Sequence, residues 1–197
     1  DSRMYNLIRQ PFSMEALTVY AKYITAQVQG ILGLSKKVII TDLDNTLWGG
    51  VIGDDGIDGI ELSRDNFEAE GFVEFQKYLK KISDLGILLC VCSKNNETIA
   101  KEVFKKHKEM ILELGDISLF VANFNDKASN IKKISETLNL GLDSFIFVDD
   151  SKVECELVKQ KLPEVLTVNL SGDSSTFASQ IEKELPFYFK NLSEEDL

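Results

Sequence analysis

Two aspartates, Asp42 and Asp44, stand two residues apart at the end of the short apolar run "VIITDL". Two carboxylates at the end of a buried strand are costly, because like charges repel and each carboxylate loses its hydration. A bound cation offsets both costs, and carboxylate oxygens are the ligands that hard divalent cations such as Mg²⁺ prefer. The pair therefore predicts a cation site.

Polar side chains also follow three later apolar runs of the chain. They are Ser93, Lys94 and Asn95 after "ILLCVCS", Lys127 after "SLFVANF", and Asp149 and Asp150 at the end of "SFIFVDD". A single aspartate in such a place is commonly a turn former or helix cap, and a single Ser or Lys is commonly surface. A turn former or a surface residue does not explain why side chains that can bind a cation or a phosphate follow all four successive apolar runs. Carboxylates for Mg²⁺, with a lysine and a serine for phosphate oxygens, are the equipment of phosphoryl transfer.

The elements that must position these residues alternate between strands and helices. Five nearly continuous apolar runs, the fifth being "EVLTVNL", are typical of parallel strands that are covered on both faces. Helical periodicity predicts helices over 13–32, 72–83, 96–108 with a possible continuation to 114, 127–138 and 153–161. The pattern predicts an α/β fold with a doubly wound, parallel, five-stranded sheet. In such sheets ligands bind at the carboxyl ends of the strands, where the polar residues lie.

Composition limits the classes of function. The chain has 197 residues, 44% of them hydrophobic and 27% charged, which is enough for one core. With 22 basic and 32 acidic residues the net charge is -10, which argues against nucleic acid or an anionic membrane as a partner. No apolar run is long enough to span a membrane and no signal peptide pattern opens the chain, so we expect a cytoplasmic protein. The opening "DSRMYN" lacks an initiating methionine and indicates a piece of a longer protein.

The cysteines do not form a zinc motif. Cys90 and Cys92 are too close together for a tetrahedral knuckle, Cys155 stands apart, and His107 is the single histidine. A free cysteine is commonly a small buried hydrophobic residue, and this holds as the default interpretation for each of the three.

The motifs resemble those of the haloacid dehalogenase superfamily: "DLDNT" the first, Ser93 the second, Lys127 in "NDKASN" the third and "FVDD" the fourth. The resemblance implies that Asp42 is the nucleophile, which forms an aspartyl-phosphate, and that Asp44 is the general acid and base. It also implies that Ser93 and Lys127 bind the phosphoryl group. The implied magnesium ligands are Asp42, the backbone carbonyl of Asp44 and Asp149, with Asp150 acting directly or through water.

A closer resemblance extends from about Tyr5 to Leu170. "DLDNTLWGGVIGDDG", "CSKNNE", "DKASNI" and "LNLGLDSFIFVDD" are similar to FkbH-like domains of polyketide synthase assembly lines. It implies that the domain takes a glyceryl unit from 1,3-bisphosphoglycerate, removes its phosphates and holds the acyl group as a cysteine thioester. The unit then passes to the phosphopantetheine arm of an acyl carrier protein, and some similar domains deliver a lactyl unit. The alternative is a simple phosphatase for a phosphorylated metabolite or phosphoprotein.

The thioester requires a thiol beside the phosphatase centre, and Cys92 is the best placed because it precedes Ser93. Lys94, a nearby magnesium ion and the start of the next helix would lower the pKa of this thiol. However, neighbouring residues of an extended strand point to opposite sides, so only a twist at the strand end brings both Cys92 and Ser93 into the site. Cys90 and Cys155 are weaker candidates. Lys94 and Asn95 are further candidates for phosphate binding.

The region between the first and second motifs is too short for a cap domain. Residues 48–62 instead predict a β-hairpin flap that turns at Asp54-Asp55-Gly56 and leaves the site open to a protein-borne arm. We expect Thr46, Trp48, Gly49 and Gly50 to line the substrate pocket, although Trp48 is equally compatible with packing under the flap. The expected domains are a helical segment 1–36 packed on the core, a catalytic domain 37–189 and an acidic tail 190–197.

Overall fold

The computed structural model describes residues 13–184 and 187, and the chain divides into two compact units, residues 36–184 and the flanking residues on either side. In the flanking unit, helix α2 (Met14–Ile31) begins where predicted, because the Ser13 hydroxyl accepts a hydrogen bond from the amide of Ala16 at 3.2 Å. The predicted acidic tail and residues 1–12 lie outside the described residues. The packing of the first segment on the core and the domain boundaries stay predictions.

The larger unit is built on an all-parallel sheet with strand order β3-β2-β1-β4-β5. Its strands are β1 (Val38–Thr41), β2 (Leu88–Ser93), β3 (Ile117–Ala122), β4 (Phe145–Asp149) and β5 (Leu166–Asn169). The central strand β1 pairs with β2 on one side and with β4 on the other. This arrangement confirms the predicted doubly wound fold. It also brings the ends of β2 and β4 beside the end of β1.

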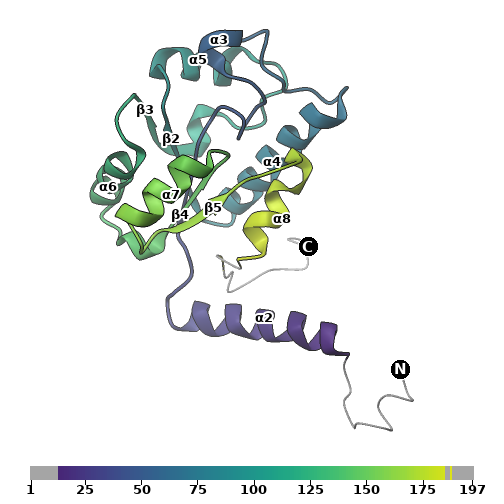
Figure 1. Ribbon diagram of the computed structural model, residues 1–197, viewed down its shortest axis with the longest axis vertical. Coiled ribbons are helices and arrows are strands. Elements are labelled where there is room, and N and C mark those ends of the chain that lie inside the picture. Colours follow the sequence, from purple (N-terminus) through teal and green to yellow (C-terminus); the bar gives the residue numbers. More distant parts are fainter. Residues whose placement is uncertain (1–12, 185–186, 188–197) are drawn as a thin grey trace. The chain divides into compact units, whose positions relative to one another are not determined.

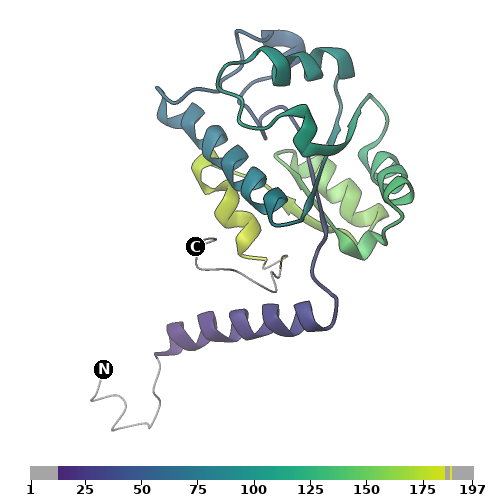
Figure 2. The ribbon, with the colours of Figure 1, turned by 180° about the vertical axis from the view of Figure 1, so that it is seen from behind.

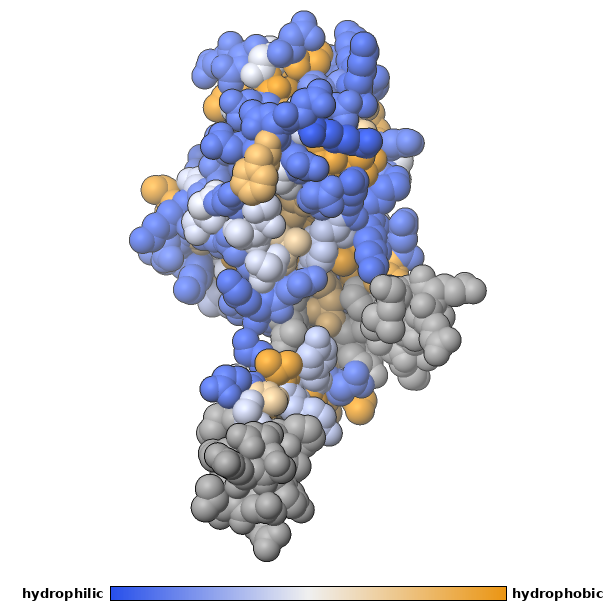
Figure 3. Space-filling model, turned by 90° about the vertical axis from the view of Figure 1, so that its right-hand side faces the viewer, coloured by the Kyte–Doolittle hydropathy of each residue, from blue (hydrophilic) through white to orange (hydrophobic). Residues whose placement is uncertain are grey.

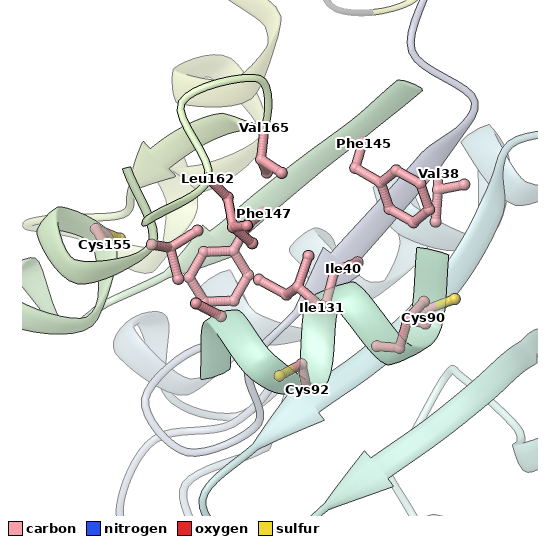
Figure 4. Close-up of a cluster of buried hydrophobic side chains, with 13 residues drawn as sticks. Val38, Ile40, Cys90, Cys92, Ile131, Phe145, Phe147, Cys155, Leu162 and Val165 are labelled. Atoms are coloured by element: carbon pink, nitrogen blue, oxygen red, sulfur yellow. The ribbon is translucent and has the colours of Figure 1, made fainter. Parts of the chain in front are cut away.

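Helices cover both faces of the sheet (Figures 1 and 2). Helices α6 (Lys127–Leu138) and α7 (Lys152–Lys161) lie on one face, and α4 (Phe67–Asp84), α5 (Glu97–Lys106) and α8 (Phe177–Glu182) lie on the other. Under α6 and α7 is a cluster of buried apolar side chains that includes Ile40, Cys92, Ile131 and Phe147 (Figure 4). Alternate residues of β1, β2 and β4 enter this cluster, as the two-residue period of a strand requires.

Two helices differ from their predicted limits. Helix α4 begins at Phe67, five residues before the predicted start, because the Asn66 side chain caps it by accepting from the amide of Glu68 at 3.1 Å. Helix α5 ends at Lys106, and the extended backbone of His107 prevents the possible continuation to 114. Helix α8 was not predicted. Among the described residues, no helix combines the length and the apolar character that crossing a membrane requires.

The flap after β1 is present, but its tip is a helical turn and not a hairpin turn. Residues Ile52–Asp55 form the short helix α3, which starts where Asp55 Oδ2 accepts from the amide of Val51 at 2.7 Å. The base of the flap is a single antiparallel bridge in which Gly49 and Glu61 exchange backbone hydrogen bonds of 2.9 and 2.8 Å. The predicted turn at Asp54-Asp55-Gly56 was wrong in type, because the carboxylate cap favours a helical turn at this point.

Candidate active site

The predicted site residues converge at the carboxyl edge of the sheet. Asp42 directly follows β1, Asp149 is the last residue of the neighbouring strand β4, and Ser93 is the last residue of β2 on the other side. Lys127 is the first residue of α6 and is 3% exposed. The carboxyl ends of parallel strands meet at one edge, and this topology gathers groups that are far apart in the sequence.

Lys127 joins the two buried carboxylates. Its Nζ lies 2.8 Å from Asp42 Oδ2 and 2.5 Å from Asp149 Oδ2. Burial alone would lower the pKa of Lys127, but the charges of Asp42 and Asp149 raise it above its ordinary value. The lysine is therefore a fixed positive charge in a site of low dielectric, where it also screens the two carboxylates from each other.

The site fits a hard divalent cation. Asp42, Asp149 and Asp150 each offer a carboxylate oxygen, and these oxygens all lie within 4.8 Å of one another. Among the described residues, Asp42 Oδ1 is buried and has no hydrogen-bond partner, so it needs a ligand to offset its desolvation. Burial and the charge of Asp42 raise the pKa of both Asp149 and Asp150, although Lys127 counteracts part of this effect. An all-oxygen donor set of this kind suits Mg²⁺.

The carboxylate of Asp44 is held by three donors. The Trp48 indole donates to Oδ1 at 2.9 Å, the amide of Ile52 donates to the same oxygen at 3.1 Å, and the Asn95 side chain donates to Oδ2 at 2.8 Å. Burial raises the pKa of Asp44 above its ordinary value, although these hydrogen bonds counteract part of the effect. A raised pKa keeps a larger fraction of the carboxyl group protonated near neutral pH, which suits a general acid.

The remaining candidates for phosphate binding have different surroundings. Ser93 is 2% exposed at the end of β2, and its hydroxyl accepts a long hydrogen bond of 3.5 Å from the Asn95 side chain. The Lys94 ammonium donates to Glu154 Oε1 at 2.6 Å on the exposed rim. Asn95 was a candidate for phosphate binding, but its side chain donates to Asp44. Asp44 is the aspartate to which the family resemblance assigns proton transfer.

The structure separates the four residues that were expected to line the substrate pocket. Trp48 is 0% exposed and packs edge to face on Phe104, with ring centroids 6.1 Å apart, so it lies under the flap. Thr46 is also fully buried, and its hydroxyl has no hydrogen-bond partner among the described residues. Gly49 and Gly50 do line a pocket.

Cys92 lies in the apolar cluster shown in Figure 4 and is 0% exposed. Burial raises the pKa of its thiol to about 12, and Lys127 counteracts only part of this effect. Strand β2 is extended up to Ser93, so Cys92 points with Cys90 toward α6 and the twist considered above does not occur. In this conformation the thiol is not accessible to a substrate, and its role as an acyl carrier stays a prediction.

A pocket of about 600 Å³ opens beside the loop that follows β1. The loop after β1, the start of α4 and the loop after β5 line it, with residues Asn45, Gly49, Gly50, Glu61, Glu68, Phe72, Gly172, Asp173 and Ser174. The contributions of α4 and of "SGDSS" to this pocket were not predicted. The sequence does contain a signal for the second, because "SGDSS" follows the fifth strand and therefore must also lie at the carboxyl edge.

Comparison with solved structures gives a match that extends over nearly the whole chain. It is the N-terminal part of the protein BF1531 from Bacteroides fragilis, containing a phosphatase domain complexed with Mg, with a TM-score of 0.90 and 39% sequence identity. The match covers 98% of this chain and 51% of that chain, so this chain spans about half the length of its neighbour. The comparison confirms the predicted fold and magnesium as the metal associated with it.

More distant neighbours support the fold alone. The cobalt-bound deoxy-D-mannose-octulosonate 8-phosphate phosphatase from Haemophilus influenzae has a TM-score of 0.52 at 16% identity, over 77% of this chain and 85% of that chain. An uncharacterized protein from Corynebacterium glutamicum has a TM-score of 0.51 at 11% identity, over 77% of this chain and 96% of that chain. Comparisons with family models and with curated proteins found no match.

Proposed function

We propose that this chain, which has the fold of the haloacid dehalogenase superfamily, is a Mg²⁺-dependent phosphatase that works through an aspartyl-phosphate. The observation that carries the proposal is the difference in surroundings between the two carboxylate oxygens of Asp42. Oδ2 is held by Lys127 at 2.8 Å, whereas Oδ1 is buried and without a partner among the described residues. Lys127 thus fixes the orientation of the carboxylate and leaves one of its oxygens without a partner among the described residues, as expected for a carboxylate that binds a metal and reacts with a phosphoryl group.

The first half of the reaction transfers the phosphoryl group to the enzyme. A carboxylate oxygen of Asp42 forms a bond to phosphorus while the bond from phosphorus to the leaving oxygen breaks. Asp44 donates its proton to that leaving oxygen, and Lys127 stabilises the negative charge on the phosphoryl oxygens. In the second half, a water molecule gives a proton to Asp44 and its oxygen forms a bond to phosphorus, while the bond from phosphorus to Asp42 breaks. Inorganic phosphate leaves, and the carboxylate of Asp42 is regenerated.

Asp42, Asp149 and Asp150, together with the backbone carbonyl of Asp44, are the residues that would hold the magnesium ion. Bound Mg²⁺ neutralises charge on the phosphoryl group and on the carboxylates around it. The residues of the chain then orient Asp42 and keep Asp44 in place.

The test uses acetyl phosphate and p-nitrophenyl phosphate as substrates, with Mg²⁺ or with EDTA. We expect hydrolysis only with the metal, and an acid-quenched protein that carries one phosphoryl group on Asp42. Asp42→Asn should abolish both signals. Asp84→Asn is the matched control, because Asp84 is an exposed aspartate at the far end of α4. Hydrolysis without a phosphorylated Asp42 would overturn the mechanism.

A second candidate is the loading of a glyceryl or lactyl unit from 1,3-bisphosphoglycerate or a related donor onto an acyl carrier protein, in polyketide biosynthesis. The observation that favours it is the resemblance of "DLDNTLWGGVIGDDG" and "CSKNNE" to FkbH-like domains. This acyl-loading function requires a cysteine thiol that is accessible to the acyl donor. Cys92 would have to leave the apolar cluster before it could carry an acyl group.

Measurement of the intact protein mass distinguishes the simple phosphatase from the acyl-loading enzyme. The domain is incubated with Mg²⁺ and freshly generated 1,3-bisphosphoglycerate without a carrier protein. A glyceryl adduct on Cys92 that hydroxylamine removes would support loading, and Cys92→Ala should then abolish the adduct. An unchanged mass, with phosphate release that Cys92→Ala leaves intact, would leave the simple phosphatase as the function.

A further inference from the structure

The walls of the pocket beside the loop after β1 are held in place by specific contacts. Asn45, which follows Asp44 directly, lines it and accepts a hydrogen bond from the amide of Gly50 at 2.9 Å. At Gly49 an added Cβ would lie 3.0 Å from Glu61 Cβ and 3.1 Å from the Phe72 ring, so a larger residue would crowd the wall. A volume of about 600 Å³ is within the range of small-molecule sites.

A hydrogen bond joins two segments of the pocket wall that are far apart in the sequence. The Ser174 hydroxyl, in the loop after β5, donates to the carbonyl of Glu68 in the first turn of α4 at 2.8 Å. Gly71 permits this contact, because a Cβ there would lie 2.0 Å from Ser174 Oγ. The Phe72 ring is 9% exposed and packs edge to face on Phe177. The pocket therefore has a fixed apolar surface next to polar walls.

Every charged residue among those that line the pocket is acidic: Glu61, Glu68 and Asp173. All three are exposed, and Asp173 is held in its charged form because hydrogen bonds from Ser175 lower its pKa. Figure 3 colours residues by hydropathy and not by charge, and it shows that the larger unit is mainly hydrophilic on the side that faces the viewer. An anionic group in the pocket would thus face carboxylates and find no cation among the lining residues.

We propose that this pocket binds the leaving group of the phosphate ester and selects a neutral, hydroxyl-rich or cationic group over an anionic one. Carboxylates accept hydrogen bonds from hydroxyl and ammonium groups, and the Phe72 ring offers an apolar surface to a carbon skeleton. This inference rests on the proposed phosphatase function. It also disfavours donors with a second anionic group, among them 1,3-bisphosphoglycerate.

The test compares three phosphate esters of similar size: glucosamine 6-phosphate, glucose 6-phosphate and 6-phosphogluconate. They carry a cationic, a neutral and an anionic leaving group. We expect kcat/KM to fall by about tenfold or more from the neutral to the anionic ester, as repulsion at partly screened distances predicts. The preference should weaken as salt is raised. Acetyl phosphate, whose acetate leaving group is too small to occupy the pocket, reports on the catalytic centre alone.

Glu68→Gln combined with Asp173→Asn removes two of the acidic charges and keeps the backbone contacts of Glu68 and the hydrogen bond to Ser175. This variant should narrow the ratio of kcat/KM between the neutral and anionic esters. Glu136→Gln is the control, because it removes an exposed charge on α6 away from the carboxyl edge and should leave that ratio unchanged.

Three results would overturn the inference: equal or better turnover of 6-phosphogluconate, a ratio that the double variant does not narrow, or hydrolysis of acetyl phosphate without turnover of the neutral or the cationic ester. A different result would contradict the proposed phosphatase function. If acetyl phosphate is not hydrolysed in the presence of Mg²⁺, the phosphatase assignment falls, together with the pocket inference that rests on it.

Discussion

The indole nitrogen of Trp48 donates a hydrogen bond to Asp44 Oδ1 at 2.9 Å, although Trp48 is fully buried under the flap. The amide of Ile52 reaches the same oxygen from the start of α3. Asp44 is therefore fixed by the flap itself. The orientation of Asp44, the proposed general acid, therefore depends on how the residues between Trp48 and Ile52 fold.

Trp48→Phe should remove this donor while it keeps an aromatic ring against Phe104. A misplaced general acid slows esters with poor leaving groups most, so turnover of alkyl phosphates should fall by about tenfold or more. Hydrolysis of acetyl phosphate, whose leaving group needs little protonation, should fall much less. Phe104→Leu is the control because it alters the packing and keeps the hydrogen bond. Equal losses for both substrates would point to a purely structural role for Trp48.

Lys127→Met should destabilise the protein in the absence of divalent metal, because Asp42 and Asp149 lose their common buried partner. Removing one side of a buried ion pair typically costs about 3–5 kcal/mol. Added Mg²⁺ should recover part of this loss, which denaturant unfolding with EDTA and with Mg²⁺ would measure. Lys161→Met breaks the exposed pair with Asp126 and should cost less than about 1 kcal/mol. A loss of similar size in both variants would contradict the neutralising role of Lys127.

Asp150→Asn should weaken the binding of Mg²⁺, because Asp150 is one of the three clustered carboxylates. The increase in Tm that Mg²⁺ produces in the unaltered chain should become smaller, since ligand binding to the folded state stabilises it in proportion to affinity. Differential scanning fluorimetry across a magnesium titration measures this shift. Asp84→Asn should keep the full shift. An undiminished shift in Asp150→Asn would exclude Asp150 as a ligand.

Native cysteines should resist alkylation. Burial raises the pKa of Cys90, Cys92 and Cys155 to about 12 in each case, so the reactive thiolate is a very small fraction at pH 8. Iodoacetamide should leave the folded protein unmodified for as long as it stays folded and should label all three cysteines in denaturant, which intact mass can follow. Selective labelling of Cys92 in the folded protein would show that the strand end opens, and would favour the acyl-carrier role.

The sequence by itself determined the parallel sheet and the position of the candidate catalytic groups. Continuous apolar runs can form strands only if both faces are covered, and the residue after each run must then lie at the carboxyl edge. This reasoning placed Asp42, Asp149 and Lys127 together, although more than a hundred residues separate the first two.

Only the tertiary structure decided what each neighbouring side chain contacts. Lys94 pairs with Glu154 and Asn95 holds Asp44, a choice that depends on distances between separate segments. Cys92 enters the apolar cluster because β2 stays extended to its last residue, whereas a sequence allows either a twisted or a straight strand end. The acidic pocket arises from the flap, α4 and the loop after β5. Its charge is a property of packing, because no local sequence pattern brings Glu61, Glu68 and Asp173 to one wall.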